Sequence, residues 1–484
     1  MGSMEYTDFL YEQVANDLAD VIGAGTFRPG ERIPSVRELS RQRRISITTV
    51  MQAYQLLEDR GLIEVRPQSG YYVRPQARIG LPVAQVREQA APDPAEVSID
   101  RLVMKILRDV LDPHLVQFGT AIPDPDLLPT ARLNKILAGL ARRSDLPMNI
   151  CGIPQGCIEL RTQVAQRSFD YGCHFTPDEV LITSGCMEAV SLSLRAVCQP
   201  GDTVAVESPT YFNMLQALEA FGLKALEIPT HPVTGVSLDA LRFAIEHHPV
   251  KACLFMTNFT NPLGALVPDE SKRELVSLLA RHEIPLIEDD IHGALYFSGE
   301  RPKVAKAYDE NGLVLLCSSF SKDLAPGYRV GWIAPGRYYD QIERLKMASN
   351  VGTALLPQFA LAEFLASGGY DHHLRRIRKV YAQKMACMSQ AVLQHFPTGT
   401  HVSCPSGGFV LWVQLPETVD SLDLYRAALK AGISLVPGYL FSAGTTYRNF
   451  IRLNAGFWSD QNAWAVRRVG ELAEDLARGA GKSV

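Results

Sequence analysis

Beyond about residue 113, short apolar runs alternate with helical stretches, and this alternation constrains the fold more than any other feature of the sequence. The runs are almost continuously apolar, as in strands that are buried on both faces of a sheet. Such strands separated by helices are typical of an α/β fold with a largely parallel sheet. We therefore expect strands at residues 179–183, 203–206, 252–256, 285–288 and 313–316.

The N-terminal residues follow a different pattern, from Met4, the expected native start, to residue 75. Apolar residues first recur at helical spacing, and the next two helical stretches begin on serines that can cap them, Ser35 and Ser46. Two short β-like runs around a turn signal then indicate a hairpin. The predicted order is three helices and two strands, at 9–22, 35–43, 46–60, 62–66 and 71–73. This is the pattern of a winged helix-turn-helix, which we predict over residues 4–75.

The segment between the two patterns has its own composition. Residues 74–95 are rich in Pro, Ala, Gln and Arg without a sustained period, which is typical of a linker. An amphipathic helix is expected at 97–111. We therefore assign 76–112 to a linker and connecting helix, and 113–484 to the α/β domain.

Composition excludes several classes of protein. Apolar residues make up 46% of the chain and charged residues 21%, as in an ordinary globular protein, and the net charge of −4 gives no global affinity for nucleic acid. The nine cysteines form no CxxC pair, so we expect free thiols in a reducing cytoplasm and no metal site. Neither a signal peptide nor an apolar run long enough for a membrane span is visible, so no membrane partner is expected.

Polar groups follow each of the expected strands, where ligands of an open α/β sheet usually bind. They are a small-residue turn leading into a helix, a tyrosine, an amide, a carboxylate and a lysine. Taken singly, each also has a structural explanation: an ordinary turn, ring packing, solvated acids, or a lysine that reaches solvent. The residues are Ser184, Gly185, Cys186, Tyr211, Asn261, Asp289 and Lys322.

Together these groups are the parts needed to hold pyridoxal 5'-phosphate. A lysine forms a Schiff base with its aldehyde, a carboxylate keeps the pyridine nitrogen protonated, and helix N-terminal amides bind phosphate. Arg329 lies seven residues after Lys322, and its guanidinium can hold phosphate oxygens in a bidentate manner.

At this point the sequence resembles a known family. "SFSKDLAPGYRVGW", residues 319–332, is similar to the lysine signature of class I aminotransferases of fold type I. With its N-terminal domain, the chain resembles the MocR-type members of the GntR regulators. The resemblance implies a large part at about 150–345, a smaller α+β part at about 346–484, and a homodimer.

The resemblance also assigns roles to the strand-end residues. Lys322 is the Schiff-base lysine, Asp289 faces the pyridine nitrogen, Asn261 binds the ring hydroxyl and Tyr211 stacks on the ring. Arg452, in "NFIRLNAG", stands where the family binds a substrate carboxylate. The phosphate is assigned to Ser184, Gly185, Cys186, Ser319 and Arg329.

Two positions depart from the family pattern. Cys151, in "CGIPQGCIELR", and His292, in "EDDIHGAL", stand where many aminotransferases have tyrosines. We expect efficient transamination to be weakened, although His292 can still hydrogen-bond the ring hydroxyl.

The N-terminal stretch "IPSVRELSRQRRISITTVMQAYQLLEDRGLI" is similar to the GntR winged helix, in which the second helix of the pair enters the major groove. Ile47 replaces the usual arginine, and an apolar contact to a thymine methyl can take its place. Residues 1–78 hold ten Arg and ten Asp or Glu, so binding must depend on local arrangement. The family's DNA contacts map to Arg37, Ser46, Thr48, Thr49 and Gly70.

Three functions agree with this reading. The first is a transcription regulator of a double-stranded operator that senses pyridoxal phosphate, another B6 vitamer, an amine or an amino acid. The second is an active aminotransferase with an autoregulatory DNA-binding head. The third, a DNA-binding protein with a cofactor-free domain, is disfavoured because Lys322, Asp289, Asn261 and Arg329 are all present.

Overall fold

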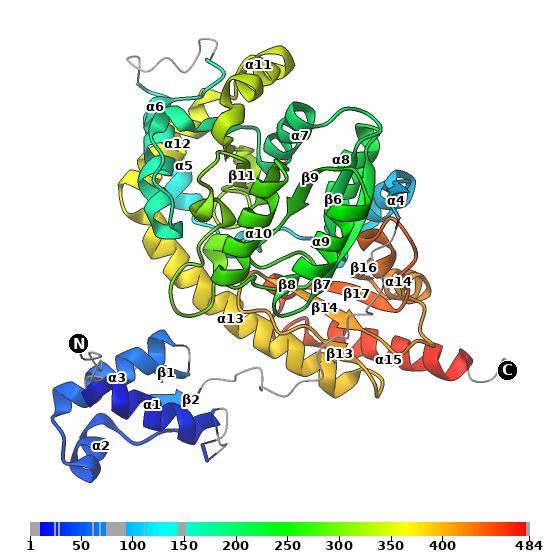
Figure 1. Cartoon of the computed structure of the whole chain (residues 1–484). Helices are drawn as coiled ribbons and strands as arrows, with labels where there is room; N and C mark the ends of the chain where they lie inside the picture. Colours follow the sequence, from blue (N-terminus) through cyan, green and yellow to red (C-terminus); the bar gives the residue numbers. More distant parts are fainter. Residues whose placement is uncertain are drawn as a thin grey trace, which may run out of the picture. The chain divides into compact units, whose positions relative to one another are not determined.

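The structure is a computed structural model, and it describes residues 10–23, 26–27, 30–60, 62–66, 69–73, 93–110, 112–143 and 152–480. The chain divides into two compact units, which are described separately below. The first is Met1–Ile79 with Phe297–Glu300, and the second is Gly80–Tyr296 with Arg301–Val484. Figure 1 labels their helices and strands.

The N-terminal unit has the predicted order of three helices and an antiparallel hairpin. Ser35 caps the second helix in a reciprocal capping box with Glu38, and Ser46 caps the third. Apolar residues of the three helices and the hairpin form one core, at whose centre Tyr54 donates a 2.6 Å hydrogen bond to the Pro34 carbonyl. The elements are α1 (Leu10–Gly23), α2 (Val36–Arg43), α3 (Ile47–Asp59), β1 (Ile63–Arg66) and β2 (Gly70–Val73).

The predicted linker falls mostly on residues 74–92, which lie outside the described residues. The predicted connecting helix corresponds to α4 (Asp100–Val110), whose Val103 and Ile106 are buried.

The large domain is built on a mixed, mostly parallel sheet, as predicted. Its strand order is β3-β7-β6-β9-β10-β11-β12-β5, with β8 paired to β7. Strands β7, β6, β9, β10 and β11 are parallel, whereas β12 is antiparallel to both of its neighbours. The strands are β3 (Ala95–Glu96), β5 (Leu181–Thr183), β6 (Thr203–Ser208), β7 (Lys224–His231), β8 (Gly235–Val236), β9 (Val250–Phe255), β10 (Leu286–Asp289), β11 (Val314–Ser319) and β12 (Gly331–Ala334).

Four strands of this sheet were not predicted: the two-residue strands β3 and β8, and the longer β7 and β12. Strand β7 contains Glu227, whose charge hides the apolar pattern, but the carboxylate is buried and accepts a 2.8 Å hydrogen bond from Ser208 Oγ. Strand β12 begins inside the lysine signature, where the residues were interpreted as a site rather than as a strand.

Helices cover both faces of the sheet, and the side-chain alternation of β10 separates the faces. Leu286 faces the apolar cluster that α9 and α10 form with the sheet. Asp289 pairs in register with Cys317, whose thiol lies 3.6 Å from Ser193 Oγ of α7, so Asp289 faces the α7 side. The helices are α7 (Cys186–Val197), α8 (Phe212–Ala220), α9 (Leu238–His247) and α10 (Asp269–Arg281).

The C-terminal part contains a small antiparallel sheet in the order β13-β14-β17-β16, with the long α13 and α15 packed together beside it (Figure 1). Strand β15 pairs with β4, so residues near 116 join this part. The strands are β4 (Val116–Gln117), β13 (His401–Val402), β14 (Val410–Gln414), β15 (Ile433–Ser434), β16 (Val436–Pro437) and β17 (Phe450–Asn454). The remaining α-helices are α5 (Thr130–Leu140), α6 (Ile158–Arg167), α11 (Tyr339–Asn350), α12 (Leu355–Ala366), α13 (Gly369–His395), α14 (Ser421–Lys430) and α15 (Ala463–Ala480). Across the residues that the structure describes, no helix has the length and apolar character of a membrane span.

Candidate functional site

Lys322 follows strand β11 and turns into the protein instead of reaching solvent. Its ammonium Nζ donates a 2.5 Å hydrogen bond to the carbonyl oxygen of Ala121. Burial, and next the positive charge of Arg452, lower the pKa of Lys322 to about 8, while Asp289 opposes the shift. A lowered pKa makes the neutral, nucleophilic amine accessible near physiological pH.

Asp289 is the last residue of β10 and is buried. Its Oδ1 atom accepts hydrogen bonds from the amide of Ile291 (3.0 Å) and the thiol of Cys186 (3.2 Å). Burial raises the pKa of Asp289 to about 6, although these two hydrogen bonds and the charge of Lys322 act in the opposite direction. The carboxylate is therefore mostly ionised at neutral pH and lies close enough to Lys322 for the two charges to interact.

The acids on either side of Asp289 have partners of their own. Glu288 accepts hydrogen bonds from Thr257 Oγ1 and the amide of Ala305, at 2.5 and 2.7 Å. Asp290 forms a buried ion pair with Arg301 at 2.5 Å. The sequence left open whether these acids are solvated or meet a cation, and the structure shows that none of them is solvated.

Arg452, on β17, carries a buried guanidinium whose hydrogen-bond partners in the described part of the chain are neutral groups. Its Nη1 donates to Asn261 Oδ1 at 3.3 Å, and its Nη2 donates to the carbonyl of Gly119 at 2.8 Å. The rings of Phe212 and Phe441 lie 5.6 and 5.4 Å from it, and its Nε has no partner. Burial lowers its pKa to about 10. No carboxylate in the described part of the chain pairs with this charge.

Tyr211 is the residue immediately before α8, three residues after the end of β6. Its ring centroid lies 4.7 Å from that of Phe212, one of the rings beside Arg452. Burial raises the pKa of its hydroxyl and the charge of Arg452 opposes the shift, so the two side chains interact. The structure thus brings the predicted ring-stacking residue to the same place as Arg452.

His292 is buried and held by one hydrogen bond. Its Nδ1 lies 3.1 Å from the carbonyl oxygen of Phe259, and this contact fixes Nδ1 as the donor. Burial and the charge of Lys322 lower its pKa to about 3, so the imidazole is neutral and its Nε2, which has no partner, is an acceptor. Cys151, the other departure from the family pattern, lies outside the described residues.

The predicted phosphate-binding turn joins β5 to α7. Gly185 has φ +91°, and a Cβ atom there would lie 2.5 Å from the guanidinium of Arg329, so a larger residue would strain the backbone and displace that guanidinium. Arg329 donates from Nη1 to Ser321 Oγ at 3.3 Å and from Nη2 to the Ser184 carbonyl at 3.4 Å. Ser319 Oγ accepts from the Ser321 amide. These residues therefore lie together at the N-terminus of α7.

One segment that contributes to the site, the loop after β4, had no recognisable signature in the sequence. The loop after β4 supplies carbonyl oxygens to both cations of the site, Gly119 to Arg452 and Ala121 to Lys322. Asn454 holds this loop by donating to the Ile122 carbonyl at 2.9 Å. Backbone acceptors can come from any residue type, so only the fold shows where they lie.

The residues of this site fit pyridoxal 5'-phosphate. An amine with a lowered pKa and a buried carboxylate lie together, as a cofactor aldehyde and a pyridine nitrogen require. The unpartnered His292 Nε2 and Arg452 Nε are buried polar atoms of the kind that a ligand satisfies. The turn at Gly185 leaves a helix N-terminus and a guanidinium for an anion.

The predicted DNA contacts lie on α2, α3 and the hairpin. Arg37 and Thr48 are exposed, and Gly70 begins β2 with φ +117°. The hydroxyls of Ser46 and Thr49 lie 2.8 Å apart, and Ser46 Oγ also accepts from the Thr49 amide at 3.0 Å. Ser46 therefore stabilises the start of α3, the predicted recognition helix.

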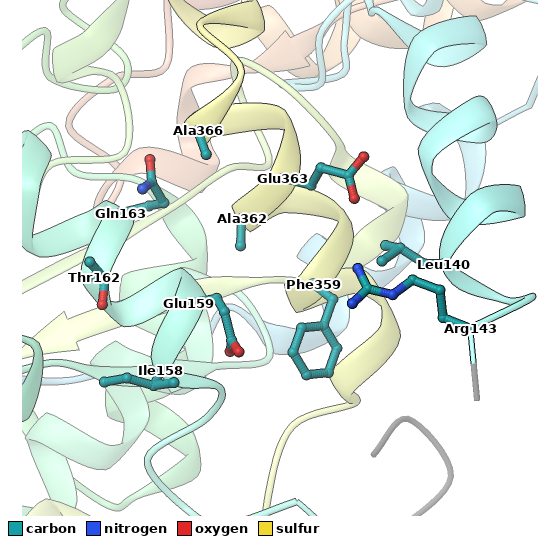
Figure 2. Close-up of a pocket in the computed structure, with 10 residues that line it drawn as sticks. All are labelled: Leu140, Arg143, Ile158, Glu159, Thr162, Gln163, Phe359, Ala362, Glu363 and Ala366. Carbon is teal, nitrogen blue, oxygen red and sulfur yellow. The ribbon is translucent and has the colours of Figure 1, made fainter. Parts of the chain in front are cut away.

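A separate cavity of about 480 Å³ lies on the large domain, away from these residues. Figure 2 shows the Phe359 ring between the side chains of Glu159 and Arg143, with α6 and α12 forming its walls. None of the predicted site residues lines it. The lining residues are Leu140, Arg143, Ile158, Glu159, Thr162, Gln163, Phe359, Ala362, Glu363 and Ala366.

Comparison with known proteins agrees with both halves of the fold. Residues 115–469 match the family of class I and II aminotransferases, and residues 10–73 match the bacterial regulatory proteins of the gntR family. YdcR of Escherichia coli K12, named an uncharacterized HTH-type transcriptional regulator, is 42% identical over 470 residues, which cover 96% of this chain and 99% of YdcR.

Solved structures resemble the larger domain. A multiple substrate aminotransferase from Thermococcus profundus has a TM-score of 0.73 and 26% identity, covering 78% of this chain and 95% of its own. A second structure is that of LysN, an α-aminoadipate aminotransferase from Thermus thermophilus complexed with N-(5'-phosphopyridoxyl)-L-leucine. It has a TM-score of 0.71 and 28% identity, and the match covers 77% of this chain and 95% of LysN.

The chain therefore belongs to the class I and II aminotransferase family through its larger domain, and a GntR-type DNA-binding domain precedes that domain. With both parts it is a member of the MocR-type transcriptional regulators, as the sequence indicated. Its cofactor is pyridoxal 5'-phosphate.

Proposed function

We propose that this protein is a cytoplasmic transcription regulator that binds pyridoxal 5'-phosphate and uses it to detect a small amine that carries a carboxylate. Lys322 would hold the cofactor through its amine, Asp289 would contact the pyridine nitrogen, and Asn261 and His292 would lie near the ring hydroxyl. When bound, the cofactor supplies an aldehyde that reacts with amines and a ring that withdraws electrons.

The observation that carries the proposal is the buried charge of Arg452. Removing a guanidinium from water costs several kcal/mol unless a partner compensates it. Among the described residues its partners are two neutral oxygens and two aromatic rings, and none of these residues hydrogen-bonds its Nε atom. A ligand carboxylate would compensate the charge and form a bidentate pair, which favours an α-amino acid over a simple amine.

Detection requires that the effector bind two states of the protein with different affinity. The cations Lys322 and Arg452 both donate to the loop at residues 119–121, which directly follows β4, and β4 in turn follows the connecting helix α4 along the chain. A ligand that takes over either cation releases a carbonyl of this loop. We infer that this exchange is how occupancy of the site alters the N-terminal part of the domain and thereby operator binding.

A direct test uses matched pairs of ligands. Full-length protein loaded with pyridoxal 5'-phosphate is mixed with amino acids and with the amines that result from their decarboxylation. We expect an amino acid, and not its decarboxylated partner, to change both the cofactor absorbance and the affinity for DNA from the region upstream of the gene. Operator affinity that stays the same with and without the cofactor, and with every ligand, contradicts the proposal.

The same experiment separates the sensor from a working enzyme. Lys322, Asp289 and Arg452 are the side chains that transamination also needs, so the chemistry is not blocked by a missing group. Steady release of keto acid with conversion of the cofactor to its amine form would show an active aminotransferase. We expect absorbance changes on binding with little or no sustained release.

The large domain also supports a proposed homodimer. Ile153, Ile158, Met347 and Val351 are between 41 and 55% exposed. The backbones at residues 152 and 352 are in contact, because a Cβ atom on Gly352 would lie 2.8 Å from the Gly152 carbonyl oxygen. A second copy covering these apolar side chains would remove them from water. Light scattering during gel filtration should give twice the 53.4 kDa of one chain, and a monomer mass at all concentrations would contradict the dimer.

A further inference from the structure

Cys186 opens α7, directly after the turn predicted to bind phosphate, but its side chain does not stay with that turn. Its thiol lies 3.2 Å from Oδ1 of Asp289, which is 103 residues further along the chain and at the end of another strand. The thiol is 3% exposed, and no other hydrogen bond to it is present in the described structure. The contact therefore joins the phosphate-binding turn to the carboxylate assigned to the pyridine nitrogen.

The two oxygens of Asp289 are unequal. Oδ1 accepts both the thiol of Cys186 and the amide of Ile291, at 3.2 and 3.0 Å. Within the part of the chain that the structure describes, Oδ2 has no hydrogen-bond donor. A carboxylate held by two donors on one oxygen cannot rotate freely, so its other oxygen keeps a fixed direction.

The thiol can fill this role only while it keeps its proton. Burial, and next the negative charge of Asp289, raise the pKa of Cys186 well above the usual value for a thiol. It is therefore an S–H donor to an ionised acceptor at neutral pH, and not a thiolate. Since Asp289 is nearly inaccessible to water as well, no solvent donor replaces the thiol if it is removed.

We propose that Cys186 is a positioning residue for the cofactor: its thiol, together with the Ile291 amide, fixes Oδ1 of Asp289 and so directs Oδ2 to the pyridine nitrogen. The side chain thus acts on the ring end of the cofactor, while the phosphate is left to the backbone of the turn, Arg329 and the neighbouring serines. This inference refines the cofactor site of the proposed function. Its test uses neither DNA nor effector, so it can fail while the regulatory proposal stands.

The test compares three probes on the full-length protein: pyridoxal 5'-phosphate, its 1-deaza analogue, in which carbon replaces the pyridine nitrogen, and pyridoxal, which lacks the phosphate. Dissociation constants are measured by equilibrium dialysis for the wild type, Cys186→Ala and Cys186→Ser. Because a hydrogen bond to a buried charged group is lost, we expect Cys186→Ala to bind pyridoxal 5'-phosphate about tenfold more weakly. The affinity of Cys186→Ala for pyridoxal should fall by the same factor, whereas its affinity for the deaza analogue should fall little. Cys186→Ser should bind pyridoxal 5'-phosphate with most of the wild-type affinity.

A loss confined to the two phosphorylated probes would assign Cys186 to the phosphate and overturn the proposal, and an equal loss for all three would reduce the thiol to a packing role. Cys253→Ala is the matched control, since Cys253 is a fully buried thiol on β9 without a contact to Asp289. If Cys186→Ala does not fold, Cys186→Val fills the volume without a donor. The pH dependence of the bound cofactor's absorbance is a second readout: it should shift in Cys186→Ala and Cys186→Val, and stay unchanged in Cys253→Ala.

Discussion

The two halves of this protein hold their predicted site residues in opposite surroundings. In the N-terminal unit the predicted DNA contacts Arg37 and Thr48 lie on the surface, and the buried residues are almost all apolar. In the larger domain the predicted site residues Asp289 and Arg452 are at most 2% exposed, and burial shifts the pKa values of both. Exposed charges respond mainly to salt, whereas buried charges respond mainly to proton binding and to ligands that compensate them.

This contrast suits a regulator. A DNA-reading surface must meet a large polyanion without desolvating its own charges, and salt-dependent attraction to phosphate serves that purpose. A site that distinguishes one small molecule from another gains selectivity when a missing ligand group leaves a buried charge unpaired. The predictions below test whether each half behaves as its surroundings require.

The largest effect is expected at Arg452. Replacing it in Arg452→Met removes the buried cation, so the affinity for carboxylated amines should fall about 100-fold, as when one member of a buried charge pair is lost. Affinity for the matching decarboxylated amines should change little. Titration of the cofactor absorbance measures both.

Arg448→Met is the control for this experiment. Arg448 lies four residues earlier, is exposed, and contacts Asp420 at 3.4 Å, so its replacement should leave both affinities unchanged. Equal weakening of both ligand classes in Arg452→Met would mean that Arg452 shapes the pocket without pairing with a carboxylate.

A smaller effect is expected from pH, again confined to the buried site. The pKa of Lys322 is lowered from 10.5 to about 8, so below pH 8 the amine is mostly protonated and is not a nucleophile. The rate of cofactor capture should therefore rise about tenfold per pH unit up to about pH 8 and then level off. Stopped-flow absorbance after mixing apoprotein with pyridoxal 5'-phosphate gives this profile.

The same lowered pKa has a consequence for folding. Between about pH 8 and 10.5 the unfolded chain binds more protons at Lys322 than the folded chain, so this residue's contribution makes the free energy of unfolding rise with pH in that window. Urea titrations give the free energy of unfolding at each pH. Between pH 8 and 10.5 we expect the slope of this free energy against pH to differ between the wild type and Lys322→Met. A capture rate that continues to rise through pH 10 would contradict the lowered pKa.

The smallest effect is expected in the N-terminal unit. Arg37→Ala removes one exposed cation, so operator affinity should fall several-fold and the slope of log K against log salt should decrease by about one. Arg43→Ala is the comparison, because Arg43 is already paired with Asp17 at 2.9 Å and should change the slope less. Fluorescence anisotropy at several salt concentrations measures both. A slope that is the same in all three proteins would remove Arg37 from the contact surface.

Local sequence signals were enough for the N-terminal unit and for the strand ends. Helices that begin at Ser35 and Ser46 follow from capping chemistry, which acts over three residues, and the structure confirms both. The positions of Asp289 at the end of one apolar strand and of Lys322 shortly after another follow from the sheet pattern. Signals of this kind need no knowledge of which distant segments meet.

The sequence by itself determined the two domain types, the cofactor and the residues that could hold it, because each depends on short-range patterns or on motifs in family order. Only the tertiary structure decided which groups pair: the thiol of Cys186 with Asp289, the carbonyl of Gly119 with Arg452, and that of Ala121 with Lys322. These contacts span 103, 333 and 201 residues and depend on strand order and on the packing of β17 and the loop after β4 against the large sheet. The same packing excludes water, which raises the pKa of Asp289 to about 6 and lowers that of Lys322 to about 8.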